Sequence, residues 1–366
     1  MPAQLGSCAG TSLRGAGLRR GPWAPLITGS AEFVLKRRTG WKSSPRTLTG
    51  STDRRTGGPV TALLPALTAK VRHAAHRTPC ACGSEAVLAD RDDATVIRHG
   101  NIVAKAHAPG TDSTELAARL KVAAALHGTL LPPLGETATP LHGRLVTLWE
   151  AGTPVDRDNP DAAPWEAAGT LLARLHKAPA ADLPHPLPDM RGPTKAARAM
   201  ERMRAAGPHP AADPVERAWA TLPAWARAEA PAPHPKLLCH GDLHLGQLVR
   251  TPEGQWLLID VDDLGLGDPA WDLARPAAWY ACGLLGPDEW TRFLAAYQGA
   301  GGPAVGADPW PALDVPARAL TAQTAALAVA KSVAEERPLD EVEQAVIDAC
   351  DRMAALPPEL APASTK

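Results

Sequence analysis

The residues of this chain with the clearest chemical potential lie in three short blocks between positions 238 and 274. The blocks read LCHGDLHLGQ, LLIDVDD and GDPAWDLA, and they begin at Leu238, Leu257 and Gly267. They offer carboxylates at Asp242 and Asp260 and a side-chain amide at Gln247. A carboxylate can accept a proton from a hydroxyl group, and carboxylate and amide oxygens can bind Mg²⁺. Phosphoryl transfer from ATP needs these groups together with a lysine on the phosphates.

The spacing of these residues also agrees with phosphoryl transfer. A kinase catalytic loop places its base and its metal-binding amide five residues apart, and Asp242 and Gln247 have that spacing. Asp260 ends an apolar run, where the second Mg²⁺ carboxylate is expected. Lys105 ends a predicted strand and is the expected phosphate-binding lysine, with Glu115 on the next predicted helix as a candidate ion-pair partner. The pattern therefore predicts a nucleotide site built from two distant parts of the chain.

In this order and spacing, the three blocks resemble the aminoglycoside phosphotransferase family, the small-molecule branch of the protein-kinase-like fold. The resemblance covers about residues 80–340 and is carried mainly by 238–273. It implies an α+β, two-lobed fold with a small β-rich N-lobe over 79–150 and a larger helical C-lobe over 151–356. It also implies an ATP- and Mg²⁺-dependent kinase that phosphorylates a hydroxyl of a small molecule, with an aminoglycoside-like acceptor and a role in antibiotic resistance.

The resemblance further implies a role for individual residues. Asp242 would be the catalytic base, and His240 would brace the loop that carries it. Gln247 and Asp260 would hold Mg²⁺, and Lys105 would bind the ATP phosphates. Glu115 would be the ion-pair partner of the lysine. Leu148, Trp149 and Glu150 would be the hinge residues beside adenine. Asp268 and Asp272 would anchor the loop from behind.

Departures from the family pattern keep other interpretations open. The metal-binding amide is Gln247 where the family usually has Asn, and HGDLHLGQ is also similar to maltokinase, a sugar kinase with a neutral acceptor. No glycine-rich loop precedes Lys105, where only Gly83 and Gly100 occur. A degenerate kinase that binds nucleotide without turnover is a further alternative, although the joint presence of the base, the metal ligands and the lysine speaks against it. A nucleic-acid partner is not expected.

The periodicity of apolar residues predicts the elements that position these groups. Strands are predicted near 86–89, 95–98, 101–105 and 145–149, and a helix over 113–127 with Ser113 or Thr114 as N-cap. Two short apolar runs lie within 237–268. Beyond residue 160, helices are predicted at 164–176, 194–206, 213–229, 269–282, 287–299, 313–335 and 338–355.

Composition and charge limit the class of protein. The chain has 366 residues, of which 45% are hydrophobic, and no stretch approaches the ~20 apolar residues of a membrane span. Six cysteines are too few and too scattered for a disulfide framework. We therefore expect a cytoplasmic protein without a membrane partner, and the oligomeric state stays open. The segment 1–78 has a net charge of +11 and the remainder −12, and such an acidic body suits a polycationic acceptor.

The N-terminal segment 1–78 shows no sustained helical or strand period. It is rich in Gly, Ser, Thr, Pro and Arg, and we expect a disordered basic leader that is dispensable for folding and is included in the chain by a misplaced start. A transit peptide and a basic arm that touches nucleic acid are the alternatives. The last residues, 357–366, are predicted to be a disordered tail.

Other polar residues near the motifs are given structural interpretations. Asp262 and Asp263 are expected to stabilise the fold, and His244 to pack within its loop. His176 lies on the apolar side of its predicted helix and is expected to be a core histidine. Cys80 and Cys82 lack the second Cys or His pair that a tetrahedral zinc site needs.

Overall fold

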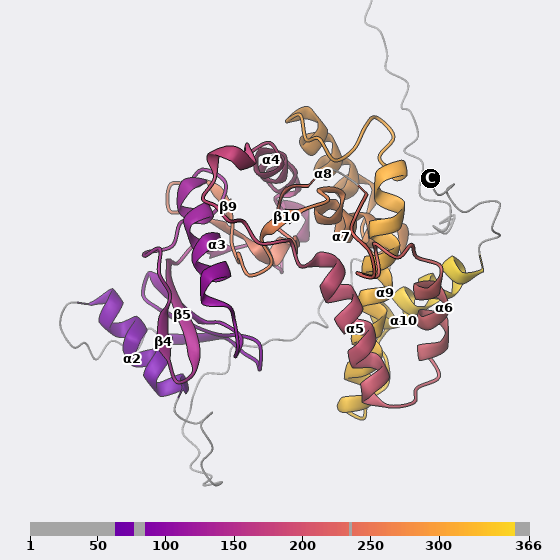
Figure 1. Cartoon of the computed structure of the whole chain (residues 1–366), viewed down its shortest axis with the longest axis horizontal. Helices are drawn as coiled ribbons and strands as arrows, with labels where there is room; N and C mark the ends of the chain where they lie inside the picture. The colour runs from indigo at the N-terminus through magenta and orange to yellow at the C-terminus, as the bar shows by residue number, and fades with distance from the viewer. Residues whose placement is uncertain (1–62, 77–84, 234–235, 356–366) are drawn as a thin grey trace, which may run out of the picture.

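The computed structural model describes residues 63–76, 85–233 and 236–355, which form a small β-rich lobe and a larger helical lobe (Figure 1). The helices are α2 (Leu63–Ala75), α3 (Ser113–Ala125), α4 (Trp165–His176), α5 (Gly192–Ala206), α6 (Ala212–Ala220), α7 (Ala270–Ala281), α8 (Pro287–Gly299), α9 (Trp310–Ala334) and α10 (Glu341–Ala354). The strands are β1 (Glu85–Asp90), β2 (Thr95–His99), β3 (Ile102–Ala106), β4 (Thr139–Leu141), β5 (Arg144–Glu150), β6 (Thr153–Pro154), β7 (Leu237–Cys239), β8 (Leu248–Arg250), β9 (Trp256–Leu258) and β10 (Gly265–Gly267). Short 3₁₀ turns are η3 (Pro160–Ala162), η4 (Ala180–Asp182) and η5 (Leu245–Gln247).

The predicted α+β, kinase-like architecture is confirmed by this arrangement. Within the described residues, no helix combines the length and the apolar character needed to cross a membrane. The predicted tail at 357–366, the cysteines Cys80 and Cys82, and residues 1–62 of the predicted leader lie outside the described residues.

Within the part of the chain that the structure describes, the N-lobe sheet has five antiparallel strands in the order β1-β2-β3-β5-β4. β3 is central, and its Lys105 lies opposite Val96 on β2 and Thr147 on β5. Side chains alternate between the two faces of a strand. Ile102 and Ala104 therefore face one side, where they join a small apolar cluster, whereas Lys105 points to the other side.

Helix α2 packs on the sheet face opposite Lys105. Its Leu63, Leu67 and Val71 recur every four residues, are at most 7% exposed, and join the cluster of Ile102 and its neighbours. The prediction that the whole segment 1–78 is disordered is therefore wrong for this helix. Three apolar residues at helical spacing are enough for an amphipathic stripe, and the polar composition of the surrounding sequence concealed them.

Leu67→Ala should lower the free energy of unfolding by about 2–5 kcal/mol, because it leaves a cavity at a fully buried position. His73→Ala, on the exposed side of the same helix, is the matched control and should change the free energy by less than about 0.5 kcal/mol. Denaturant titration of the two variants measures both values. A stability equal to wild type for Leu67→Ala would show that α2 does not pack on the sheet.

The ends of several helices differ from their predicted positions. Helix α3 is capped by Asp112, whose carboxylate accepts hydrogen bonds from the backbone N–H groups of Thr114 and Glu115, both at 2.8 Å. The predicted caps, Ser113 and Thr114, were one or two residues too late, since Asp caps a helix as well as Ser does. Helix α6 ends at Ala220, nine residues before the predicted end.

The C-lobe is a packed set of helices around the segment that carries the three sequence blocks. Helix α4 packs against α8, and α9 packs against α5, α7 and α10 (Figure 1). Most buried apolar side chains among the described residues belong to one large cluster that these helices enclose. Strands β7 and β10 form one small pair, and β6, β8 and β9 form a three-stranded sheet, so each of the three blocks begins in a short strand.

The chain crosses between the lobes immediately after β5. Glu150 still pairs with β3, Ala151 donates its N–H to the carbonyl of Asn101 at 2.7 Å, and Thr153 already pairs with β8 in the C-lobe. A Cβ added to Gly152 would lie 2.5 Å from the Cβ of Val249, so the crossing is tight enough to need glycine.

Candidate active site

A sharp turn at Gly241 aims Asp242 out of the loop between β7 and β8. The backbone φ of Gly241 is +84°, and an added Cβ would lie 2.4 Å from the carbonyl oxygen of Asp263. Only glycine accepts this conformation without strain and also allows so close a backbone approach. The Gly-Asp pair of the first sequence block therefore sets Asp242 beside the loop that carries Asp263.

Asp272 on α7 holds this loop from behind, as the sequence predicts. Its Oδ2 accepts a hydrogen bond from the backbone N–H of His240 at 2.6 Å, and its Oδ1 accepts one from the N–H of Gly241 at 2.7 Å. The other predicted anchor, Asp268, accepts a hydrogen bond from the N–H of Ala270 at 2.9 Å and so fixes the start of α7. Both carboxylates are buried, and charge-assisted bonds of this kind make the turn rigid.

His176 continues this hydrogen-bond chain into the core. Its Nε2 lies 3.0 Å from Oδ2 of Asp272, and its Nδ1 lies 2.8 Å from the hydroxyl of Tyr297 on α8. The core role predicted for His176 is confirmed, since only 1% of the residue is exposed. His176, Asp272 and Cys239 offer ligand atoms within 4.8 Å of one another. Both ring nitrogens of His176 and the carboxylate are already hydrogen-bonded, so the group is a structural network.

His240 links the two halves of the site. The residue is fully buried, and its Nε2 lies 2.8 Å from the carbonyl oxygen of Ile259, the residue before Asp260. Because a carbonyl only accepts hydrogen bonds, Nε2 carries the proton. His240 therefore connects the loop of Asp242 to the segment of Asp260, which is the bracing geometry expected from the sequence.

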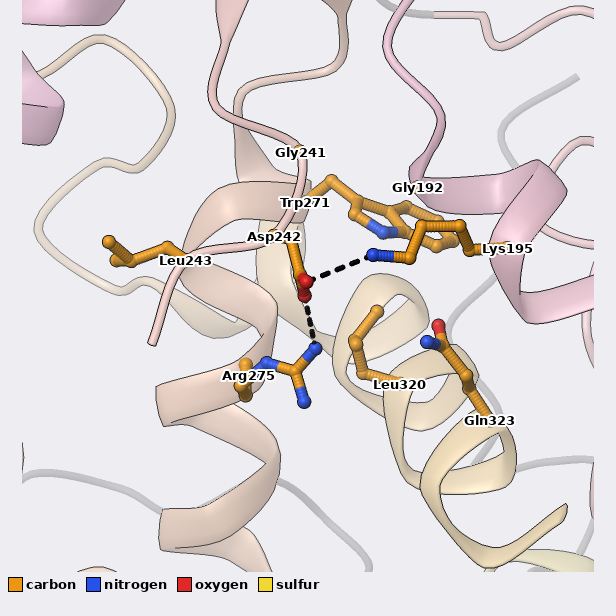
Figure 2. Close-up of a pocket in the computed structure, with 9 residues that line it drawn as sticks. All are labelled: Gly192, Lys195, Gly241, Asp242, Leu243, Trp271, Arg275, Leu320 and Gln323. Carbon is orange, nitrogen blue, oxygen red and sulfur yellow. Dashed lines mark hydrogen bonds and ion pairs between the residues drawn. The ribbon is translucent and has the colours of Figure 1, made fainter. Parts of the chain in front are cut away.

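Two cations surround Asp242 (Figure 2). Nη2 of Arg275 on α7 lies 2.5 Å from Oδ1 of Asp242, and Nζ of Lys195 on α5 lies 2.9 Å from Oδ2. Burial alone would raise the pKa of Asp242, but Arg275 and Lys195 outweigh it and lower the pKa to about 2. Lys195 also contacts Oδ2 of Asp263 at 2.6 Å. The carboxylate of Asp242 is therefore ionised throughout the neutral pH range.

The sequence reasoning did not identify Lys195 or Arg275. Arg275 follows Asp272 by three residues, so both lie on one side of α7, and this spacing could have identified the arginine. Lys195 precedes Asp242 by 47 residues in a weakly patterned helix, and no local signal connects it to the loop.

His244 packs within its own loop, as expected, because its Nδ1 accepts a hydrogen bond from the N–H of Gly246 at 3.0 Å. Burial, together with nearby Arg275, lowers the pKa of His244 to about 4.

Gln247 and Asp260 lie at the same end of the β8–β9 hairpin. Leu248 pairs with Leu258, and the N–H of Ile259 donates to the carbonyl of Gln247 at 2.9 Å. Gln247 is 9% exposed, and its side chain makes no hydrogen bond within the described part of the chain. A side-chain amide oxygen without a hydrogen-bond partner and a carboxylate at the same end of a hairpin are ligand types that fit Mg²⁺.

Lys105 reaches this end of the hairpin from the N-lobe. Its Nζ lies 2.6 Å from Oδ1 of Asp260 and 2.9 Å from Oδ2 of Asp262. Burial lowers the pKa of Lys105, but the two carboxylates outweigh it and hold the pKa above its usual value. Asp262 also faces Nδ1 of His107 at 2.8 Å, and Lys105 and His107 keep the pKa of this carboxyl well below its usual range despite burial.

The expected pairing of Lys105 with Glu115 is wrong. Glu115 instead contacts Nη1 of Arg119 one turn later on α3, at 3.0 Å, and half of its side chain is exposed. Arg119 is buried, and its Nε donates to the carbonyl of Leu264 at 2.8 Å. The ten-residue separation of Lys105 and Glu115 does not determine how α3 is tilted or rotated relative to the sheet. The lysine instead contacts carboxylates of the C-lobe.

The three expected hinge residues lie at the end of β5, next to the crossing between lobes. Leu148 and Trp149 pair with Ala104 and Val103 of β3. Trp149 is 8% exposed, and its Nε1 donates to the hydroxyl of Thr147 at 2.9 Å. Glu150 is the last residue of the strand and is exposed. Their place next to the crossing between the lobes agrees with the predicted contact with adenine, which stays a prediction.

Comparisons with known proteins identify a family for this chain. The model of the phosphotransferase enzyme family matches residues 85–314, which is more than half of the chain. No curated protein sequence matches it significantly.

Solved structures show where the fold occurs. A choline/ethanolamine kinase family protein from Mesorhizobium loti is 19% identical with a TM-score of 0.51, over 80% of this chain and 96% of that one. The choline kinase LicA from Streptococcus pneumoniae is 16% identical with a TM-score of 0.50, over 75% and 94%. A thermostable mutant of aminoglycoside phosphotransferase APH(4)-Ia is 12% identical with a TM-score of 0.50, over 73% and 92%. At these identities, the likeness concerns the fold alone.

Proposed function

The chain belongs to the phosphotransferase enzyme family, and we propose that it transfers the γ-phosphoryl group of ATP to a hydroxyl group of a small molecule, with Mg²⁺ bound at Gln247 and Asp260. The family gives the reaction class, a phosphotransferase with a hydroxyl acceptor. The donor nucleotide, the metal and the acceptor are the proposed part.

One observation carries the proposal. Nζ of Lys105 lies 2.6 Å from Oδ1 of Asp260 although 155 residues separate them in the chain. Folding thus joins the N-lobe cation to the carboxylate, while His240 connects that carboxylate's segment to the loop of Asp242. A phosphate-binding lysine, a metal-binding carboxylate and a base are the parts that phosphoryl transfer needs in one place.

In the proposed step, the acceptor oxygen forms a bond to the γ-phosphorus, and the bond from that phosphorus to the bridging oxygen breaks. ADP leaves with the electron pair of the broken bond, and the acceptor proton passes to Asp242 and then to solvent. Arg275 and Lys195 hold Asp242 ionised and in place, so it accepts a hydrogen bond from the hydroxyl and orients the oxygen for attack. Bound Mg²⁺ would neutralise charge on the phosphates.

Release of ADP by the purified protein tests the proposal. The reaction contains ATP, Mg²⁺ and one acceptor at a time, including kanamycin as a polycation and maltose as a neutral sugar. We expect ADP release that depends on both Mg²⁺ and an acceptor. Nucleotide binding without any acceptor-stimulated ADP release would instead identify a degenerate kinase.

Gln247→Asn should retain more activity than Gln247→Ala. Asn keeps a carbonyl oxygen for Mg²⁺ although its side chain is one methylene shorter, whereas Ala removes the ligand. The measurement is ADP release as a function of Mg²⁺ concentration, and we expect a higher Mg²⁺ requirement for the Ala variant. If both variants lose the same activity at saturating Mg²⁺, residue 247 is not a metal ligand that works with either a Gln or an Asn side chain.

The acceptor class is a separate question. The net charge of −12 beyond residue 78 favours a polycationic, aminoglycoside-like acceptor at long range, and the similarity to maltokinase favours a neutral sugar. At contact distance, the side chains beside Asp242 determine the choice. The proposed use of ATP, together with the unpaired, buried cysteines Cys239, Cys282 and Cys350, fits a cytoplasmic location for the enzyme.

A further inference from the structure

A hollow beside Asp242 is the place where an acceptor hydroxyl would lie (Figure 2). It is bounded by helices α5, α7 and α9 and by the loop of Asp242, and its accessible volume is about 10 Å³. A volume of this size holds about one water molecule. Only the reacting end of an acceptor would therefore enter it. The lining residues are Gly192, Lys195, Gly241, Asp242, Leu243, Trp271, Arg275, Leu320 and Gln323.

The charged groups of the hollow are mainly cationic. Lys195 and Arg275 line it, and Asp242 is the one anion in the lining. Asp263 lies behind Lys195 and also faces Nε of Arg191 at 4.0 Å. An amino group brought to Asp242 would meet two cations that already pair with this carboxylate, and like charges in contact are unfavourable.

The hollow also has more hydrogen-bond donors than acceptors. Arg275 has five N–H groups, of which one is used on Asp242 within the described residues. Lys195 has three, and two are used on Asp242 and Asp263. A ligand that contacts the remaining N–H groups would supply acceptor atoms.

Gln323 on α9 gives a second, independent indication of a ligand. The residue is 6% exposed, yet its side-chain amide makes no hydrogen bond to any other described residue. Figure 2 shows the side chain of Gln323 at the same hollow as those of Lys195 and Arg275. Trp271 and Leu320 supply an apolar wall between these polar groups.

Resting on the proposed function, we propose that the acceptor is a small hydroxy compound with an anionic group, a carboxylate or a phosphate, a few bonds from the reacting hydroxyl. Arg275 and Gln323 bind the anionic group, and the hydroxyl faces Asp242. A guanidinium binds a carboxylate or a phosphate through two parallel hydrogen bonds, and the amide N–H₂ of Gln323 supplies a further donor. The transfer step is the one already described, with the acceptor proton passing to Asp242 and ADP as the leaving group.

A matched set of three-carbon compounds tests this inference. Glycerate carries a carboxylate, glycerol 3-phosphate a phosphate, glycerol no charge, and 3-amino-1,2-propanediol a cation. ADP release is measured with each compound, and binding of each is measured by ligand-observed NMR without nucleotide. We expect at least one of the two anions to exceed glycerol by tenfold or more in kcat/KM, and the cation to be the poorest. The better of the two anions identifies the source of the negative charge.

Variants locate the effect. Gln323→Leu keeps the size of the side chain and removes the amide, so it should raise KM for the preferred anion with little change in kcat. Gln344→Leu, on the exposed face of α10, is the matched control and should leave both constants unchanged. An unchanged KM in Gln323→Leu would remove Gln323 from the site.

The results separate this inference from the proposed function. Equal or better turnover of glycerol, the amino compound, maltose or kanamycin would overturn the anionic acceptor and leave phosphoryl transfer intact. Preferential binding of the anions without ADP release from any compound would retain the anion site and overturn the proposed reaction. A lack of preference in both assays would overturn the anion site.

Discussion

Asp242→Asn should lower kcat by about 10²–10⁴-fold, the loss typical of a general base, and leave Mg²⁺-dependent ATP binding nearly unchanged. The amide keeps the shape of the side chain and can still hydrogen-bond the acceptor hydroxyl, but it does not take up the proton. One of Arg275 and Lys195 keeps its hydrogen bond to the remaining oxygen, whereas the other faces the amide N–H₂, which cannot accept one. ADP release at saturating acceptor measures the change.

Asp263→Asn is the matched control for this variant. It makes the same carboxylate-to-amide change at a residue that also contacts Lys195, at 2.6 Å, and that has no proposed contact with the acceptor. We expect it to retain most of the wild-type kcat. If both variants lose kcat to a similar extent, the loss comes from the changed charge around Lys195, and Asp242 is not the base.

Asp260→Asn should weaken Mg²⁺-dependent ATP binding at least tenfold and also lower turnover. The variant removes a negative charge that would face the divalent cation, and even indirect changes at metal sites cost about 10–100-fold in metal affinity. Asn is the suitable replacement because Asp260 has a φ of +67°, a left-handed conformation that Asn adopts more readily than other side chains.

Titration of nucleotide binding with Mg²⁺ measures this effect. Wild-type protein should bind ATP more tightly as Mg²⁺ increases, whereas Asp260→Asn should show a shallow dependence. Binding of ATP without Mg²⁺ provides the control. There Asp260→Asn should bind as well as wild type or better, since it removes a carboxylate that competes with the phosphates for Lys105. A Mg²⁺ dependence equal to wild type would contradict the metal role.

The parts of the site that sequence predicts are those within one short segment. The turn at Gly241 and the anchor at Asp272 lie in blocks whose order and spacing already specify a kinase-type loop, and the structure has them in that arrangement. The cations on Asp242 were not predicted, since a contact between α5 and the loop depends on how α5 packs against α9. Tertiary packing, and not local pattern, brings Lys195 to the base.

The errors have specific physical causes. Glu115 is the first acid on the helix after Lys105, but it pairs with a buried arginine one turn later on the same helix. Helix α2 is not evident from the average composition of its segment, which hides an apolar stripe as short as Leu63, Leu67 and Val71. The fold class itself was predictable, since alternation in the first half and helical spacing in the second are long-range patterns.

Calorimetric titration of wild type, Asp242→Asn and Asp260→Asn with ATP, with and without Mg²⁺, tests the central claim most directly, because it needs no acceptor. The claim is that Asp242 acts on the acceptor and Asp260 on the metal and its nucleotide. The account predicts that Asp242→Asn keeps the Mg²⁺-dependent heat and affinity of wild type and that Asp260→Asn loses them. Loss of Mg²⁺-dependent binding in Asp242→Asn with retention in Asp260→Asn would contradict the account and reverse the two roles.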